Sequence, residues 1–414
     1  MARSTEGGVE RLTLGLGDPA TTPVSVASGV TTTALRPTDA VQVRDHVRDA
    51  IGRRAPLRVV GRGTWLDAGR PVRNAQPMCL DGLTGIVDYT PGDLTLTARA
   101  GTTLAEIAEA TAEHGQWLAL APWGGDSGSL GATAATASAG PMSGSLGTPR
   151  DIVIGLEAVT GAGDIVRGGG RVVKNVAGFD LTRLMIGAWG TLGVITEVSV
   201  RLRGLPEREA TIALPAPNAT AALAELLVRL RAASIAPLAL EIVSAGLARH
   251  LGIGVDTLVL ARVAGNDEVV TSQCAAWGEI GDASDVPHDV WKRLRVAEPP
   301  DAAVVRLSSP VGRLAETWTA ANRLAALGGG FAHASVLRAV ARVVMPHASG
   351  LLPEVALDAL RANSRDVRIF ERLPSPLWAT LSPNAISDSL SRGVRAAFDP
   401  HRLLNPGILG DDRE

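Results

Sequence analysis

The sequence has few lysines, cysteines and histidines, and each shortage excludes a kind of site. Of its 40 basic residues only Lys174 and Lys292 are Lys, which indicates a coding bias toward Arg. Cys79 and Cys274 stand far apart without a CxxC pattern, so we expect neither a disulfide framework nor a Cys-based metal site. The 7 His residues form no spaced cluster, and no metal site is predicted.

A surplus of positive charge and a long apolar run are also absent. The formal net charge of -2 argues against non-specific binding to nucleic acid or anionic lipid. No stretch of about 18 strongly apolar residues occurs, so no membrane span is expected. The first residues, MARSTEGGVERL, lack the charged-then-apolar pattern of a signal peptide, and we therefore expect a cytoplasmic protein.

The pattern along the chain predicts two folded domains and two flanking segments. Residues 1–28 are rich in Gly, Thr and Pro without periodicity, and are expected to form a flexible arm. Leu205-Pro206 marks a boundary between a first domain, 29–204, and a second domain, 205–385. The second domain has the pattern of an α+β fold, with helices on one side of a sheet. Residues 386–414 form a carboxy-terminal segment that is expected to return to the first domain.

Individual elements follow from periodicity and capping signals. Thr103 and Glu106 form a capping box that opens a helix, which Gly115 can end in a left-handed conformation. The turn GAGD at 161–164 joins two strand-like runs and predicts a hairpin. Further strands are expected at 57–63, 85–89, 94–100, within 190–202 and near 333–344, and helices near 218–233, from about 267 and at 311–326.

Three glycine-rich segments of the first domain indicate a nucleotide cofactor. They are GRGTW at 61–65, GGDSGSLGATAATASAG at 124–140 and GAWGTLGVIT at 187–196. Exposed amides in such turns form nests that hold a diphosphate without Lys or Mg²⁺, and small residues allow close approach to the backbone. The alternative is that these segments are only turns and closely packed strands. No complete GxGxxG or GxxxxGK[ST] motif is present, which argues against a Rossmann site for NAD and against a P-loop.

The order of several motifs resembles one family of flavoproteins. The motifs are GRGTWLDAGR, TPGDLTLTARAGTTLAEI, GSLGATAATASAGP, RDIVIGLEAVTGAGDIVRGGG, VVKNVAGFDLTRLMIGAWGTLGVITEV and DPHRLLNPG. They resemble the FAD-binding domain of the vanillyl-alcohol-oxidase or PCMH type, and most of all the FAD-binding E subunits of bacterial glycolate oxidases. The resemblance is strong over 30–204, moderate in the tail and limited to layout over 210–385. It implies a two-lobed FAD-binding domain followed by the α+β domain.

The resemblance also implies which residues contact FAD. The first phosphate-binding loop is matched by Gly61, Arg62, Gly63 and Thr64. The segment under the ribityl chain and ring is matched by Pro122, Gly124, Gly128, Ser129, Gly131 and Ala132, its exit by Ser138 and Gly140, and the strand entry near the ring or adenine by Gly193, Val194 and Ile195. On this basis, Gly131→Val is expected to project into the cofactor space and to abolish FAD retention in a folded chain.

The resemblance places one further motif, KNVAGFDLTRL, beside the flavin. Lys174 could there offset negative charge on the reduced ring, with Asn175 next to it. The alternative is a surface Lys near a structural pair of Asp180 and Arg183 on a helix turn.

Two departures from the family pattern limit what can be inferred. Trp65 stands where many relatives carry a His that tethers FAD, so we expect FAD to be bound non-covalently. The motif HxGDGNxH, which the resemblance links to a metal and a base for D-2-hydroxy acid oxidation, is missing. The nearest candidates are His333 and His347, and His333 is expected to be an ordinary loop or strand residue. No catalytic residue is assigned.

Three functions stay open at this point. The first is the FAD-binding subunit of a glycolate-oxidase-type complex. A catalytic flavin subunit would then oxidise a small 2-hydroxy acid, and an iron–sulfur subunit would carry electrons on, with peripheral attachment at the inner membrane through the complex. The second is a self-sufficient FAD dehydrogenase of a hydroxy acid or sugar-like alcohol, and the third is a structural partner that has lost its flavin. The missing metal and base motif favours the first over the second, and the Gly loops favour both over the third.

Overall fold

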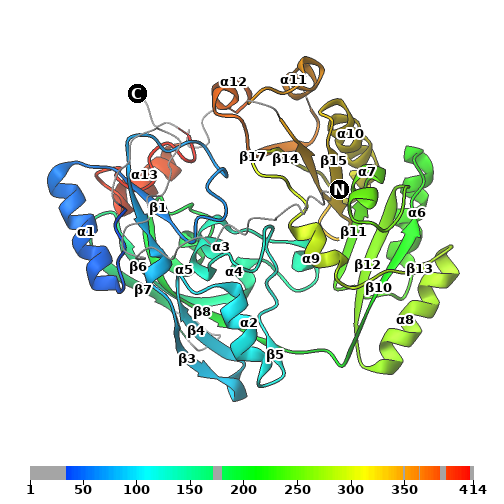
Figure 1. The fold of residues 1–414 in the computed structure, drawn as a ribbon, viewed down its shortest axis with the longest axis horizontal. Helices are drawn as coiled ribbons and strands as arrows, with labels where there is room; N and C mark the ends of the chain where they lie inside the picture. Colours follow the sequence, from blue (N-terminus) through cyan, green and yellow to red (C-terminus); the bar gives the residue numbers. More distant parts are fainter. Residues whose placement is uncertain (1–33, 171–179, 348–349, 363, 383–387, 411–414) are drawn as a thin grey trace, which may run out of the picture.

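The computed structural model shows two lobes, each built on its own sheet (Figure 1). It describes residues 34–170, 180–347, 350–362, 364–382 and 388–410. The chain passes from the first lobe to the second between β9 (Arg203–Gly204) and β10 (Arg208–Pro215). Near its end, α13 (Ser389–Phe398) lies beside the first lobe again, where Phe398 packs with Leu156 and Met185 (Figure 1).

The first lobe contains a five-stranded antiparallel sheet in the order β3-β4-β8-β6-β7, a parallel pair of β1 and β2, and a short pair of β5 and β9. Its strands are β1 (Leu57–Val60), β2 (Gln76–Cys79), β3 (Ile86–Thr90), β4 (Thr95–Arg99), β5 (Gln116–Trp117), β6 (Val153–Thr160), β7 (Ile165–Gly169) and β8 (Gly193–Arg201). Its helices before α13 are α1 (Ala40–Arg53), η1 (Leu80–Gly82), η2 (Pro91–Asp93), α2 (Leu104–Ala112), α3 (Leu130–Thr136), η3 (Pro141–Gly144), α4 (Pro149–Ile152) and α5 (Leu181–Met185). The core joins buried side chains such as Val47, Leu57 and Val198 to Leu404 from the carboxy-terminal segment.

The second lobe is one antiparallel sheet of eight strands in the order β13-β10-β12-β11-β15-β16-β14-β17. The strands after β10 are β11 (Ala239–Val243), β12 (Leu258–Gly265), β13 (Ser284–Asp285), β14 (Ala303–Ser308), β15 (Phe331–Ser335), β16 (Val340–Met345) and β17 (Val367–Arg372). The helices are α6 (Thr220–Ala232), α7 (Ala245–His250), α8 (Asp267–Ile280), α9 (Val290–Arg295), η4 (Val311–Arg313), α10 (Leu314–Leu327), α11 (Glu354–Arg361), η5 (Ser375–Leu377) and α12 (Trp378–Leu381).

Strand alternation decides how the two faces of this second sheet are covered. Leu240, Ile242 and Val343 point to one face and form a large core with residues of the long helices α6, α8 and α10. Ala239 and Val243 point to the other face and pack with the short helices α7 and α9. The predicted α+β fold is therefore confirmed, with the long helices on one side. The rest of the second face is left for contact with the first lobe.

The elements predicted from local signals are present. In the capping box of α2, the Glu106 amide donates to Thr103 Oγ1 at 3.1 Å, and the Thr103 amide donates to Glu106 Oε2 at 2.6 Å. The Thr103 amide and the Thr103 hydroxyl, which both donate to the Glu106 carboxylate, hold the pKa of Glu106 below its usual value. Gly115 has a φ of +61° just after this helix, as a left-handed end requires. The predicted hairpin is the pair of β6 and β7. The predicted arm, 1–28, lies outside the described residues.

Candidate cofactor site

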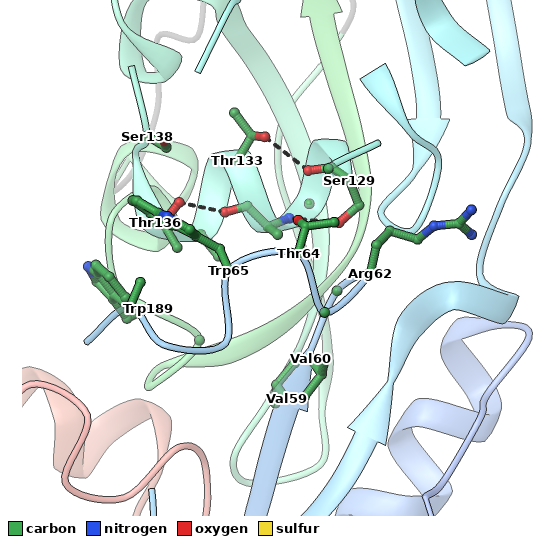
Figure 2. A pocket seen from close by; sticks show the side chains of 18 of the residues that line it. Val59, Val60, Arg62, Thr64, Trp65, Ser129, Thr133, Thr136, Ser138 and Trp189 are labelled. Atoms are coloured by element: carbon green, nitrogen blue, oxygen red, sulfur yellow. Dashed lines mark hydrogen bonds between the residues drawn. The ribbon is translucent and has the colours of Figure 1, made fainter. Parts of the chain in front are cut away.

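A cavity lies where the loop after β1, helix α3 and the loop before β8 meet (Figure 2). The wall consists of residues 58–66, 68, 80, 122–125, 128, 129, 131–133, 135, 136, 138, 189, 190, 193, 195, 405 and 408. The glycine-rich segments of the sequence, far apart along the chain, thus face one space.

The structure places nearly all of the sequence-predicted cofactor residues in this wall. They are Gly61, Arg62, Gly63, Thr64, Pro122, Gly124, Gly128, Ser129, Gly131, Ala132, Ser138, Gly193 and Ile195. Two predicted residues do not line the cavity. Val194 is fully buried in the core of the first lobe, because it points to the opposite side of β8 from Ile195. Gly140 lines a second cavity, between the lobes.

The loop after β1 has the features of an anion-binding turn. Gly63 has a φ of +74°, a backbone conformation that residues other than Gly rarely adopt. Within the described residues, the amides of Gly61, Arg62, Gly63 and Thr64 donate no hydrogen bond to the protein. A Cβ on Gly61 would lie 2.6 Å from Ser129 Oγ, so only Gly allows the loop to pack this closely on α3. The loop therefore brings a series of free amides to the cavity.

Two buried polar atoms in the wall have no hydrogen-bond partner among the residues that the structure describes. They are an Nη atom of Arg58, a residue that is only 8% exposed, and Ser138 Oγ. Burial lowers the pKa of Arg58 to about 10, and no carboxylate of the described residues compensates its charge. A buried cation without a counter-charge is costly, so this position suits a ligand with negative charge. The sequence analysis missed Arg58; the signal was an Arg inside the apolar strand LRVV.

Two tryptophans form the aromatic side of the wall. The rings of Trp65 and Trp189 are stacked with centroids 6.2 Å apart (Figure 2). Trp189 holds a left-handed φ of +54°, which is strained for a bulky residue and needs support from its surroundings. Since an indole does not bond covalently to a flavin as an imidazole can, Trp65 is consistent with a dissociable cofactor.

The carboxy-terminal segment supplies that support through Asn405. Its side-chain amide donates to the Trp189 carbonyl at 2.7 Å and accepts from the Val59 amide at 2.8 Å. The Asn405 amide donates to the Leu57 carbonyl at 2.9 Å. One residue thus ties β1 to the Trp189 loop and lines the cavity between them. The motif DPHRLLNPG contains Asn405, but the motif by itself does not predict this contact.

Gly131 has a different role from the one predicted. A Cβ at this position would lie 2.5 Å from Ala100 Cβ and 2.8 Å from the Ala100 carbonyl oxygen, both in the turn after β4. The missing side chain therefore faces the protein interior, and the expectation that Gly131→Val projects into the cofactor space is wrong. Ala135, one helical turn further along α3, is half-buried and lines the cavity.

Ion pairs hold the cavity loops against the second lobe. Asp67, in the loop after β1, accepts from Arg372 at 2.8 Å, and Arg372 also contacts Glu298 at 2.6 Å. Asp126 accepts from Arg295 at 2.7 Å, and the Arg295 carbonyl accepts from the Gly124 amide at 2.9 Å. Because Arg372 and Arg295 are buried, these bonds specify how the second lobe sits on the loops.

The remaining predicted residues are placed as follows. Asp180 caps α5 by accepting from the Arg183 amide at 2.9 Å, and the two side chains approach to 3.5 Å, as the structural alternative predicted. Lys174 and Asn175 lie outside the described residues. His333 is a buried residue of β15, and in the described part of the chain no group of three His, Cys, Asp or Glu side chains is placed to hold a metal ion. Among the described helices, none combines the length and apolar character needed to cross a bilayer.

Comparison with known proteins agrees with this geometry. Residues 32–169 match the family described as an FAD binding domain. The chain is 41% identical over 171 residues to glycolate oxidase subunit GlcE of Escherichia coli (strain K12), a match that covers 41% of this chain and 48% of that protein. It therefore spans about half the length of this relative. A second relative is D-2-hydroxyglutarate dehydrogenase of Xanthomonas citri pv. viticola, which is 27% identical over 397 residues, or 84% of this chain and 83% of that protein.

The overall fold is also shared with a solved structure. Substrate-bound p-cresol methylhydroxylase superposes with a TM-score of 0.72 over 92% of this chain and 89% of that chain, at 15% sequence identity. The fold is thus that of a two-lobed protein with the cavity in its first lobe. More specifically, residues 32–169 form an FAD-binding domain, and FAD is the cofactor of this domain. The free amides, the uncompensated Arg58 and the small residues of the wall fit that group.

Proposed function

We propose that the chain is the FAD-binding subunit of a glycolate-oxidase-type complex, and that it takes part in the oxidation of glycolate or a similar 2-hydroxy acid. The observation that carries the proposal is the cavity, where free amides and the unpaired charge of Arg58 meet a wall of small residues. Support for the substrate class comes from relatives that are named for glycolate and for D-2-hydroxyglutarate. As further partners we propose a catalytic flavin subunit and an iron–sulfur subunit.

In this proposal the residues of the chain bind and orient the cofactor. The amides at 61–64 and the guanidinium of Arg58 hold the diphosphate, because both present hydrogen-bond donors to the cavity. Ser138 gives a further hydrogen bond, and Trp65 leaves FAD dissociable. When bound, FAD accepts two electrons from the C–H bond of a hydroxy acid or from a partner flavin.

Purification of the chain alone tests this function. We expect a yellow protein whose FAD is released intact by acid precipitation, since nothing tethers it. Anaerobic glycolate should bleach the flavin only after the catalytic flavin subunit is added. A colourless chain that takes up no added FAD would contradict the proposal and favour a structural partner subunit.

A stand-alone FAD dehydrogenase is the second candidate, because a charged second cavity adjoins the cofactor cavity and shares Trp123 with it. Rapid bleaching of the isolated chain by glycolate or D-lactate is the result that would favour this candidate.

A further inference from the structure

The second cavity lies between the open face of the second sheet and the first lobe. Gly140 and Ser143 border it from the first lobe, and Trp123 lines both this cavity and the cofactor cavity. A molecule held here would therefore lie next to the cofactor site, with Trp123 at the junction.

The floor of the cavity is a row of polar residues on neighbouring strands. Glu241, His333, Arg342 and Arg306 come from β11, β15, β16 and β14, which are adjacent in the sheet. His333 pairs with Arg342, and Arg342 with Arg306, across the ladders. These side chains point away from the core under α6, α8 and α10, since their sequence neighbours fill that core. A sheet face with this many charges is built for polar contact.

Among the described residues, the arginines in the floor of the cavity are only partly neutralised by carboxylates. Arg342 is compensated by Glu298 and Glu371, at 2.7 and 2.6 Å, and Arg306 has a single contact to Glu371 at 3.1 Å. The Nε atom of Arg306 is buried without a partner.

Arg338, in the turn between β15 and β16, is compensated even less. It donates only to Ser143 Oγ, at 3.2 Å, and no carboxylate of the described residues lies within ion-pair distance of it. Although Arg338 is exposed as a whole residue, partial burial of its guanidinium, and then the nearby charge of Arg306, lower its pKa. Two guanidinium groups that repel each other beside a cavity favour an anion between them.

Beside the charged arginines, His333 offers the cavity a neutral hydrogen-bonding group. Its Nδ1 lies 3.0 Å from Glu241 Oε2, and its ring contacts the Trp123 ring with centroids 4.6 Å apart. No described residue hydrogen-bonds to Nε2, which is the atom left to meet a ligand. Burial lowers the pKa of His333, so the ring is neutral near pH 7. The tautomer of the neutral ring that donates from Nδ1 to Glu241 has Nε2 as an acceptor.

We propose that this cavity binds a small carboxylate that carries a hydroxyl group on the adjacent carbon. Arg338 and Arg306 receive the carboxylate, and His333 Nε2 accepts the hydrogen bond of the hydroxyl. The choice of a hydroxy acid rests on the proposed function, whereas the preference for a carboxylate rests on the cavity alone. Sequence inspection could not single out these arginines among 38.

Calorimetric titration of the FAD-loaded chain with oxalate tests the carboxylate half. We expect saturable binding that weakens about ten- to a hundredfold in Arg338→Met, as for the loss of a charged hydrogen bond. Arg338 is exposed at a strand turn, so this variant should fold, which circular dichroism checks. The matched control is Arg323→Met, an exposed position on α10 across the sheet, where binding should not change. No oxalate binding, or equal weakening in both variants, would overturn the proposal.

Glycolate and acetate test the hydroxyl half without any substitution. Glycolate offers a hydroxyl to His333, and acetate does not, so glycolate should bind the wild-type chain several-fold more tightly. Equal affinities would remove His333 from the proposal. The flavin absorbance of each sample reports FAD binding separately. A yellow chain that binds no carboxylate refutes the inference alone, and a chain that takes up no FAD refutes the proposed function.

Discussion

Replacement of Arg58 by Met should change two quantities in opposite directions. In the FAD-free chain, the described residues give the buried guanidinium no counter-charge, and the lowering of its pKa to about 10 corresponds to a cost of about 3 kcal/mol. Met has a similar length and no charge. The free energy of unfolding of the FAD-free variant should therefore rise, by about 1 to 3 kcal/mol.

FAD binding should weaken in the same variant. Loss of one charge-assisted hydrogen bond costs about 1.5–3 kcal/mol, so we expect the dissociation constant of FAD to rise about ten- to a hundredfold. Urea unfolding of the FAD-free protein gives the first quantity, and quenching of flavin fluorescence on binding gives the second.

Arg62→Met is the comparison variant. Arg62 is exposed, donates only to the Asp81 carbonyl at 3.4 Å, and extends away from Trp65 and Trp189 (Figure 2). Its loss should leave the stability of the FAD-free chain unchanged and weaken FAD binding less. An Arg58→Met protein that is less stable without FAD and binds FAD normally would refute the reasoning, because Arg58 would then be compensated inside the protein.

Three further variants test the packing around the site. Gly131→Val should lower the yield of folded protein, because the Val side chain would clash with Ala100, whereas Ala135→Phe should fold and lose FAD. The soluble fraction of each variant reports folding, and its flavin content reports FAD binding. A Gly131→Val protein that folds normally and loses as much flavin as Ala135→Phe would contradict the packing role of Gly131. Asn405→Ala leaves the Val59 amide and the Trp189 carbonyl without their partner and should cost about 2–4 kcal/mol in urea unfolding; a cost below about 1 kcal/mol would count against its role. Arg372→Met leaves Glu298 and Asp67 without a shared cation and should cost about 3–5 kcal/mol, while the exposed Arg323→Met should cost almost nothing.

Much of the first lobe could be predicted because its signals are local. The capping box of α2, the hairpin of β6 and β7 and the Gly-rich loop after β1 each depend on residues a few positions apart. The amides that face the cofactor cavity are consecutive in the sequence, so the loop and its ligand class could be inferred together. The order of the motifs along the chain indicated the resemblance to a family of flavoproteins, and this resemblance indicated FAD as the cofactor.

The direction of side chains could not be predicted in the same way. Val194 and Ile195 are neighbours in one motif and are both buried in the core of the first lobe, but only Ile195 also borders the cavity. Gly131 belongs to the same small-residue segment as Ala132 and Ala135, yet it faces Ala100. A stretch of Gly and Ala shows that close approach is needed, but it does not show whether protein or cofactor makes that approach.

The sequence by itself indicated a nucleotide cofactor and the elements that surround it, since both depend on short-range spacing, and the family resemblance indicated that this cofactor is FAD. Tertiary structure alone decided that Arg58 has no counter-charge and that Asn405 supports the Trp189 loop. It also decided that Arg306, Arg338 and His333 share one cavity with Trp123. Arg306 comes from β14 and His333 from β15, and the order of the strands in the sheet, β11-β15-β16-β14, differs from their order in the chain. The pairing of distant strands sets which side chains meet, and no local pattern records that choice.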